Sequence, residues 1–233
     1  MKNIVQFSGG KDSTAMLLMM LEKGMPVDEI IFCDTGMEFP EVYQHIKQVE
    51  KYIGRKITRL SADYSFEYYL YDIPTKPKKE KNRGRGYGWP RMFNRWCTSR
   101  MKIRVTEKYL KNLGEYITYI GIAADEPKRH KNVSENVMHP LYEWGITEVE
   151  ALNYCYDKGF DFGGLYKNHK RIGCWCCPLQ RMSDLRFLYH NHKDLWKKLK
   201  EMDKNAPYPF KEKYSLEDLE QRFDLEEAQG YLF

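Results

Sequence analysis

The amino-acid sequence predicts an α/β fold with a doubly wound, mostly parallel five-stranded sheet and a small helical C-terminal region. Two patterns lead to this prediction. Short apolar runs alternate with stretches of helical periodicity up to about residue 147, and from residue 148 onward the periodicity is helical throughout. Strands that alternate with helices are typical of a parallel sheet covered on both faces. We therefore divide the chain into an α/β domain at residues 1–147 and a helical region at residues 148–233.

The expected strands are short apolar runs bounded by polar or turn-forming residues. They lie at residues 5–7, 29–33, 57–60, 116–122 and 136–139. The expected helices lie at residues 12–23, 41–53, 148–158, 183–202 and 215–229, and Gly54 ends the second of them. Parallel sheets bind ligands at the carboxyl ends of their strands, beside the point where the strand order reverses. Polar residues that directly follow the strands are therefore the first candidates for a site.

The composition is that of a globular protein. Of the 233 residues, 42% are hydrophobic and 30% are charged, which excludes a disordered chain. The longest apolar run, AMLLMML, is too short to span a bilayer. The N-terminus runs into the first motif and leaves no room for a signal peptide, so we expect a cytoplasmic protein. The net charge of +5 permits an anionic ligand but does not by itself indicate nucleic acid.

Residues 74–95 interrupt the alternation of strands and helices. This segment, PTKPKKEKNRGRGYGWPRMFNR, is rich in Lys, Arg, Gly and Pro. It would form either a surface loop or a lid that orders on an anion. Because Tyr87, Trp89 and Phe93 are interleaved with basic residues, the segment would also suit the phosphates and bases of DNA or tRNA.

The segment SGGKDST, residues 8–14, lies between the first expected strand and the first expected helix. Its two glycines allow a tight turn and let backbone N–H groups approach phosphate oxygens. The N-terminus of the following helix adds partial positive charge, and Lys11 adds a full one. An ordinary strand-to-helix turn capped by Asp12 or Ser13 would use the same residue types. The spacing of the glycines excludes a Walker A loop.

This heptapeptide resembles the PP-loop of the ATP pyrophosphatase superfamily. Four later segments resemble the phosphoadenosine phosphosulfate (PAPS) reductase branch of that superfamily. They are FCDTGMEFPE at residues 32–41, WPRMFNRWCTSRMK at 89–102, GIAADEPKR at 121–129 and HPLYEWG at 139–145. From these segments the chain is identified as a member of the PAPS reductase family. The resemblance implies a Rossmann-like adenine nucleotide alpha-hydrolase fold, and an enzyme that splits the α–β bond of ATP and adenylates a substrate.

The resemblance also assigns expected roles to residues of this chain. The residues expected to cradle the leaving pyrophosphate are Ser8, Gly9, Gly10, Lys11, Asp12, Ser13 and Thr14. Asp12 and Asp34 are candidates to hold Mg²⁺, a hard cation that favours oxygen ligands. The further residues expected to contact the nucleotide are Asp34, Thr35, Gly36, Gly121 and Glu126. Lys102 and Arg129 would neutralise the α-phosphate or an anionic acceptor, unless they are solvated surface charges.

Six cysteines in a reducing compartment favour metal binding or catalysis over disulfides. Cys174 and Cys177 form a C-x-x-C pair within RIGCWCCP, with Cys176 between them. Cationic Lys170 and Arg171 would favour thiolates there. Iron–sulfur members of the family match Cys97, Cys174 and Cys177, which implies a [4Fe–4S] cluster. Cys176 is the fourth candidate ligand, although adjacent side chains tend to point apart.

Other readings of the cysteines stay open. A structural zinc ion at the same four positions, a redox pair and inert thiols are the alternatives. Cys33 and Cys155 lie in apolar patterns and are expected to pack as small hydrophobic residues. Apolar positions in the helical region would pack internally or form the face of a homodimer; they are Trp196, Leu199, Phe223 and Leu225.

The function predicted from these features is adenylation of an acceptor with release of pyrophosphate, in the service of sulfur transfer. A sulfur donor such as a cysteine desulfurase is an expected partner. The alternative is reduction of PAPS or adenosine phosphosulfate, with Cys97 or Cys176 as nucleophile. Three differences from the reductases argue against that alternative: no cysteine follows Cys177, Trp96 replaces a cysteine, and the SGGKDS loop is intact.

Overall fold

The computed structural model describes residues 1–75, 86–131 and 134–230. The chain divides into two compact units. Unit 1 consists of Met1–Asp34, Glu38–Ala62 and Arg100–Ile172, and unit 2 consists of Thr35–Met37, Asp63–Ser99 and Gly173–Phe233. This division does not coincide with the predicted boundary at residue 147. The basic residues 76–85 lie outside the described part, so the predicted lid or nucleic-acid segment stays a prediction.

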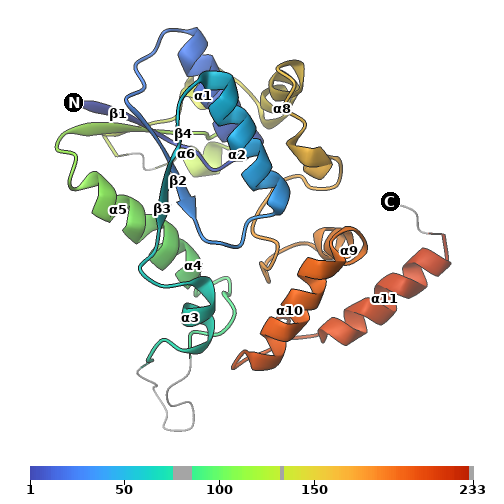
Figure 1. The fold of residues 1–233 in the computed structure, drawn as a ribbon. Helices are drawn as coiled ribbons and strands as arrows, with labels where there is room; N and C mark the ends of the chain where they lie inside the picture. The colour runs from blue at the N-terminus through green and yellow to red at the C-terminus, as the bar shows by residue number, and fades with distance from the viewer. Residues whose placement is uncertain (76–85, 132–133, 231–233) are drawn as a thin grey trace. The chain divides into compact units, whose positions relative to one another are not determined.

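Unit 1 contains a five-stranded, all-parallel sheet in the order β3-β2-β1-β4-β5 (Figure 1). The strands are β1 (Lys2–Gln6), β2 (Glu29–Asp34), β3 (Thr58–Ser61), β4 (Tyr116–Ile120) and β5 (Val137–Met138). All five coincide with predicted strands to within a few residues, which confirms the predicted fold class. Because β1 pairs with both β2 and β4, the strand order reverses at β1.

Helices cover both faces of this sheet. The larger helices of unit 1 are α1 (Lys11–Glu22), α2 (Pro40–Ile53), α5 (Arg104–Leu110) and α8 (Glu148–Asp157). Leu110 of α5 packs in a cluster with Ile4 and Ile31 on one face. Val5 and Ile30, the alternate positions on the same strands, are also fully buried and point to the other face. Short elements complete the unit: α6 (Pro127–His130), α7 (Pro140–Glu143) and the 3₁₀ helix η3 (Phe162–Lys167).

Local sequence explains where the main helices begin and end. Pro40 opens α2, and Gly54 ends it with a φ of 66°. Thr147 and Glu150 form a capping box that starts α8. Within α2, Val42, Ile46 and Val49 are buried at helical spacing, as the sequence predicts.

Unit 2 is helical. It contains α3 (Phe66–Tyr71), α4 (Trp96–Thr98), α9 (Met182–Asn191), α10 (Lys193–Asn205) and α11 (Leu216–Ala228), and the π-helical turn η2 (Ser99–Ile103) leads from α4 to α5. The prediction of one helix at residues 183–202 is wrong, because His192 leaves the helical conformation with φ −132° and ψ 63°. In a continuous helix, positions 189 and 196 would lie about 10 Å apart. The break instead brings the Tyr189 and Trp196 rings to 5.3 Å, and both contact Phe223.

Among the described residues, no helix has the length and apolar character needed to cross a bilayer.

Candidate functional site

The glycine loop connects the end of β1 to the first turn of α1. Gly9 has a φ of 76°, and a Cβ there would lie 2.8 Å from Val42 Cγ1. Gly10 is the N-cap of α1, which begins at Lys11. Both a left-handed conformation and close packing therefore require glycine at position 9. The loop places the N-terminus of α1 at the point where the strand order reverses.

Lys11 is a buried cation in the first turn of α1. Its side chain is 4% exposed, and Nζ lies 3.2 Å from Asp12 Oδ2 and 3.1 Å from Glu148 Oε1. Its backbone N–H donates to the Tyr166 hydroxyl at 2.8 Å. Burial raises the pKa of Tyr166, so this hydroxyl stays protonated. The ammonium and the backbone N–H of Lys11 are both expected to bind a phosphate group, and in this structure both contact side chains of unit 1.

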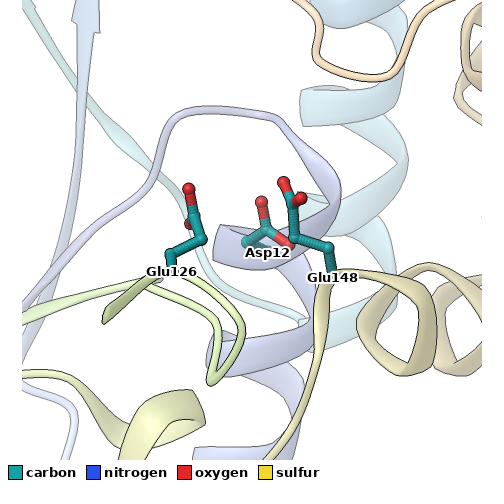
Figure 2. A group of neighbouring side chains, drawn as sticks. All are labelled: Asp12, Glu126 and Glu148. Carbon is teal, nitrogen blue, oxygen red and sulfur yellow. The ribbon is translucent and has the colours of Figure 1, made fainter. Parts of the chain in front are cut away.

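Three carboxylates lie close together at the first turn of α1, as Figure 2 shows. Asp12 comes from α1, Glu126 caps α6, and Glu148 opens α8. One oxygen from each lies within 4.8 Å of the others. Burial raises the pKa of Asp12, and Lys11 opposes this effect. Asp12 Oδ1 is buried and has no hydrogen-bond partner, so the group holds an oxygen that a hard cation could bind.

Four basic side chains balance these carboxylates. Besides Lys11, Arg129 lies 2.8 Å from Glu126, Arg171 Nε lies 3.1 Å from Glu148, and Lys170 lies 3.8 Å from Glu148. The Arg171 guanidinium also pairs with Glu126. Lys170 and Arg171 thus pair with carboxylates of unit 1, and their predicted effect on the cysteines stays a prediction. We call these seven residues the charged cluster: Lys11, Asp12, Glu126, Arg129, Glu148, Lys170 and Arg171.

A cavity of about 410 Å³ opens beside the glycine loop. Five predicted site residues line it: Ser8, Ser13, Lys102, Gly121 and Arg129. Apolar side chains such as Phe7, Phe32 and Ile120 form much of the rest. Ligand pockets of about 300–1,000 Å³ that are mostly apolar with a few polar groups are typical of small-molecule sites. Cys33 and Thr106 also line the cavity, and their Sγ and Oγ1 atoms lie 3.1 Å apart.

The residues at the end of β2 and after it have contacts of their own. Asp34 Oδ1 accepts a hydrogen bond from the Tyr43 hydroxyl at 2.7 Å, and Asp34 is not part of the carboxylate group around Asp12. Lys102 Nζ lies 3.3 Å from Glu38 Oε1. Thr35 and Gly36 belong to unit 2, where the Thr35 hydroxyl lies 3.8 Å from Cys174 Sγ.

Unit 2 brings the predicted cysteine ligands into one region. Burial raises the pKa of the Cys177 thiol, Cys97 is near enough to raise it further, and Arg95 and Lys211 lower it. Cys176 is 1% exposed and lies near Tyr71, whose pKa is raised to about 12 mainly by burial and also by Cys176. Cys97, Cys174 and Cys177 are partly exposed. The thiol of Cys176 is thus buried, whereas the other three can be reached.

The residue types of these cysteines fit a metal centre. Thiolates are ligands both of [4Fe–4S] clusters and of structural zinc ions. Among the described residues, the only three His, Cys, Asp or Glu side chains with ligand atoms within 4.8 Å of one another are those of Asp12, Glu126 and Glu148. The choice between a cluster and zinc at the cysteines therefore stays a prediction.

His45 is linked to the glycine loop by hydrogen bonds through Thr14. Its Nε2 donates to Thr14 Oγ1 at 2.9 Å, and Thr14 Oγ1 in turn donates to the Gly10 carbonyl at 3.0 Å. His45 is 1% exposed, and Nδ1 is buried without a hydrogen-bond partner. Burial lowers the pKa of His45 from 6.5 to about 4, so the ring is neutral when the protein is folded.

Because the pKa of His45 is lowered in the folded protein, the free energy of unfolding depends on pH. The unfolded chain binds the His45 proton near pH 6.5 and the folded chain only near pH 4, so the stabilisation is complete above pH 6.5 and is lost as the pH falls toward 4. Between pH 7 and pH 5 we expect the free energy of unfolding to fall by about 2 kcal/mol from this group. Urea unfolding of wild type and His45→Gln at both pH values measures it. His45→Gln should lack this fall of about 2 kcal/mol, and His192→Gln should retain it. An equal fall in the free energy of unfolding for wild type and His45→Gln would contradict the role given to His45.

Sequence reasoning missed several residues of the site. Glu148 was seen as a helix start, and Tyr166 and Thr106 were not singled out. The signal of Glu148 in the sequence is weak, because acidic residues are common in the first turn of any helix, where they interact favourably with the helix dipole. Cys155 is fully buried, as expected, whereas Cys33 lines the cavity.

The sequence of this chain is similar to those of known proteins and to one protein-family model. A sequence model of the phosphoadenosine phosphosulfate reductase domain matches residues 2–180. An uncharacterized protein of Methanocaldococcus jannaschii is 29% identical over 217 residues, covering 84% of this chain but only 40% of that protein. An adenosine 5′-phosphosulfate reductase of Geobacillus kaustophilus is 26% identical over 182 residues, covering 73% of this chain and 72% of the reductase.

The fold has a counterpart of known structure. The crystal structure of the PAPS reductase of Candida auris, a phosphate complex, superposes with a TM-score of 0.52 at 18% sequence identity, covering 75% of this chain and 82% of that one. This likeness concerns the fold. Together with the match over residues 2–180, it confirms the relationship predicted from the five motifs. The chain belongs to the phosphoadenosine phosphosulfate reductase domain family.

Proposed function

We propose that this chain binds ATP with Mg²⁺ at the glycine loop and adenylates an acceptor with release of pyrophosphate. The observation that carries the proposal is the buried Lys11 ammonium at the N-terminus of α1, surrounded by three carboxylates and three further cations. Burying the charges of Lys11, Glu126 and Glu148 carries a desolvation cost, and such clusters of buried ionisable groups are candidates for functional sites. The N-terminus of α1 favours a phosphate group there.

In this proposal Asp12, Glu126 and Glu148 would hold Mg²⁺, which would supply positive charge to the phosphate oxygens. Lys11 and the N–H groups of the loop would bind the leaving pyrophosphate. Arg129 and Arg171 now pair with the carboxylates and would turn to the phosphates. These groups act by position and charge, which are the main sources of catalysis in phosphate chemistry.

The cavity beside the loop would take the nucleoside. Its apolar walls suit an adenine ring, and Ser8 and Ser13 at its edge belong to the loop that would bind the phosphates. Lys102 and Arg129 line the same cavity, so either could neutralise the α-phosphate or an anionic acceptor.

Sulfur transfer is the proposed use of the activated acceptor. Cys97, Cys174 and Cys177 would ligate a [4Fe–4S] cluster, with zinc as the alternative, and Cys176 is the candidate for a fourth ligand. A DNA or tRNA base is a candidate acceptor, and a cysteine desulfurase is a candidate sulfur donor.

Exchange of labelled pyrophosphate into ATP tests the proposal. Wild type should catalyse Mg²⁺-dependent exchange once a competent acceptor is present, and should bind ATP by calorimetry without one. Glu148→Gln is expected to lower exchange by about 100-fold, because it removes a charge that would hold Mg²⁺. Asp157→Asn changes an exposed carboxylate of the same helix and should have little effect. No binding of ATP with Mg²⁺ by wild type would refute the nucleotide site.

Similarity to an adenosine 5′-phosphosulfate reductase keeps sulfonucleotide reduction as the second candidate. It predicts sulfite release from PAPS or adenosine phosphosulfate with thioredoxin, and loss of that activity in Cys97→Ser or Cys176→Ser. Sulfite release without pyrophosphate exchange would favour the reductase.

A further inference from the structure

The cysteine turn, residues 174–177, is fixed by backbone hydrogen bonds at both ends. The Trp175 N–H donates to the Met37 carbonyl at 3.0 Å, and the Cys177 N–H donates to the Cys174 carbonyl at 3.1 Å. The Gln180 N–H donates to the Cys177 carbonyl at 3.1 Å. These bonds leave the carbonyls of Trp175 and Pro178 to other donors.

Two side chains from outside the turn supply those donors. Gln180 Nε2 donates to the carbonyls of Cys174 at 2.6 Å and Trp175 at 2.9 Å. Lys211 Nζ donates to the carbonyls of Pro178 and, at 3.2 Å, Gln180. One amide and one ammonium thus bind four carbonyls of residues 174–180. Gln180 Oε1 is buried without a partner, so the amide is oriented by its donor side alone.

Lys211 is an unusual residue for this task. Its side chain is partly buried, and its ammonium binds two backbone carbonyls. An ammonium that is partly removed from water carries a desolvation cost, which a simple turn would avoid by leaving its carbonyls to water. The ammonium of Lys211 instead binds two carbonyls of the segment that directly follows Cys177, so it holds that segment in place.

We propose that Gln180 and Lys211 are positioning residues that hold the cysteine turn in its ligating conformation before a metal binds. The inference rests on the proposed metal site of Cys97, Cys174 and Cys177. Groups that orient metal ligands commonly change metal affinity by about 10–100-fold when they are removed.

Hydrogen exchange of the metal-free protein tests the positioning. In Lys211→Met and Gln180→Met, the amides of Trp175 and Cys177 should exchange at least about 10-fold faster than in wild type, since a freed turn opens more often. Lys213→Met is the matched control, because Lys213 is an exposed lysine two positions along the same segment. Unchanged exchange in both variants would overturn the proposal whatever metal the protein binds.

Anaerobic titration with Co²⁺ tests the effect on the ligands, since cobalt–thiolate absorption reports binding directly. Lys211→Met should bind Co²⁺ about 10–100-fold more weakly than wild type and show a shifted absorption band, Lys211→Arg should restore much of the affinity, and Lys213→Met should match wild type. Equal affinity and spectrum in Lys211→Met would overturn this proposal and leave the metal site standing. Failure of wild type to bind Co²⁺ or to form a cluster would overturn both, while ATP binding would still report on the nucleotide site separately.

Discussion

Replacing Lys11 with methionine is expected to destabilise unit 1 by about 3 kcal/mol and to lower the affinity for ATP by about 100-fold. Its Nζ lies between Asp12 and Glu148, and Glu148 is 9% exposed. Removing one partner of a buried ion pair leaves the other charge without that counterion and largely without water. Arg171 remains on Glu148 and limits the loss, so we place the effect at the lower end of the usual range.

Urea unfolding and ATP calorimetry measure the two parts of this result. Lys23→Met, at the exposed end of the same helix, is the control and should change both by little. The double variant Lys11→Met with Glu148→Gln should be more stable than Lys11→Met alone, because the unpaired carboxylate is gone. A Lys11→Met protein as stable as wild type would show that the pair is solvated.

A single methyl group at position 121 is expected to have the second largest effect. A Cβ on Gly121 would lie 2.8 Å from Asp12 C and from Ser13 N, both atoms of the α1 backbone. Backbone cannot move aside as a flexible side chain can, so the end of β4 and the first turn of α1 must separate. We expect Gly121→Ala to lower the free energy of unfolding by about 3 kcal/mol and to weaken ATP binding, since the loop would shift.

The matched control for this variant is Gly173→Ala. A Cβ at Gly173 would meet nothing within 4 Å, so the same chemical change should be nearly neutral for stability. Thermal unfolding of both variants gives the comparison. Similar stabilities for the two would mean that the contact between β4 and α1 yields easily, and would weaken the case for a rigid loop.

Local patterns explain what could be predicted from the sequence. The five strands follow from short apolar runs, and the glycine loop follows from residue types within one heptapeptide. The partners of Lys11 could not be predicted in this way. Glu148 and Tyr166 are far from Lys11 in sequence, and only the packing of α8 and η3 brings them to the loop. The break at His192 was missed for a related reason, since the contacts of Tyr189 and Trp196 with Phe223 on α11 decide it.

The cysteine turn has one feature that could be predicted from the sequence and others that could not. The spacing of its cysteines indicates a turn with two thiols on one side, and the structure gives adjacent Cys176 and Cys177 different neighbours, Tyr71 and Cys97. The sequence does not show that Gln180 and Lys211 bind the carbonyls of that turn. Nor does it show that Arg171, only a few positions before Cys174, gives its charge to Glu126 and Glu148.

The internal charge balance of the charged cluster has a thermodynamic consequence. Before any ligand arrives, each of the three carboxylates is already paired with at least one of the four basic side chains. A divalent cation that bound alone would take the carboxylates from the guanidinium groups and leave these without counterions. A polyphosphate that bound alone would take the guanidinium groups and leave the carboxylates without counterions. Each ligand therefore lowers the free-energy penalty for the other, and by linkage that help is mutual. In the proposed function, metal and nucleotide enter as one cooperative unit, and neither accumulates in the empty site by itself.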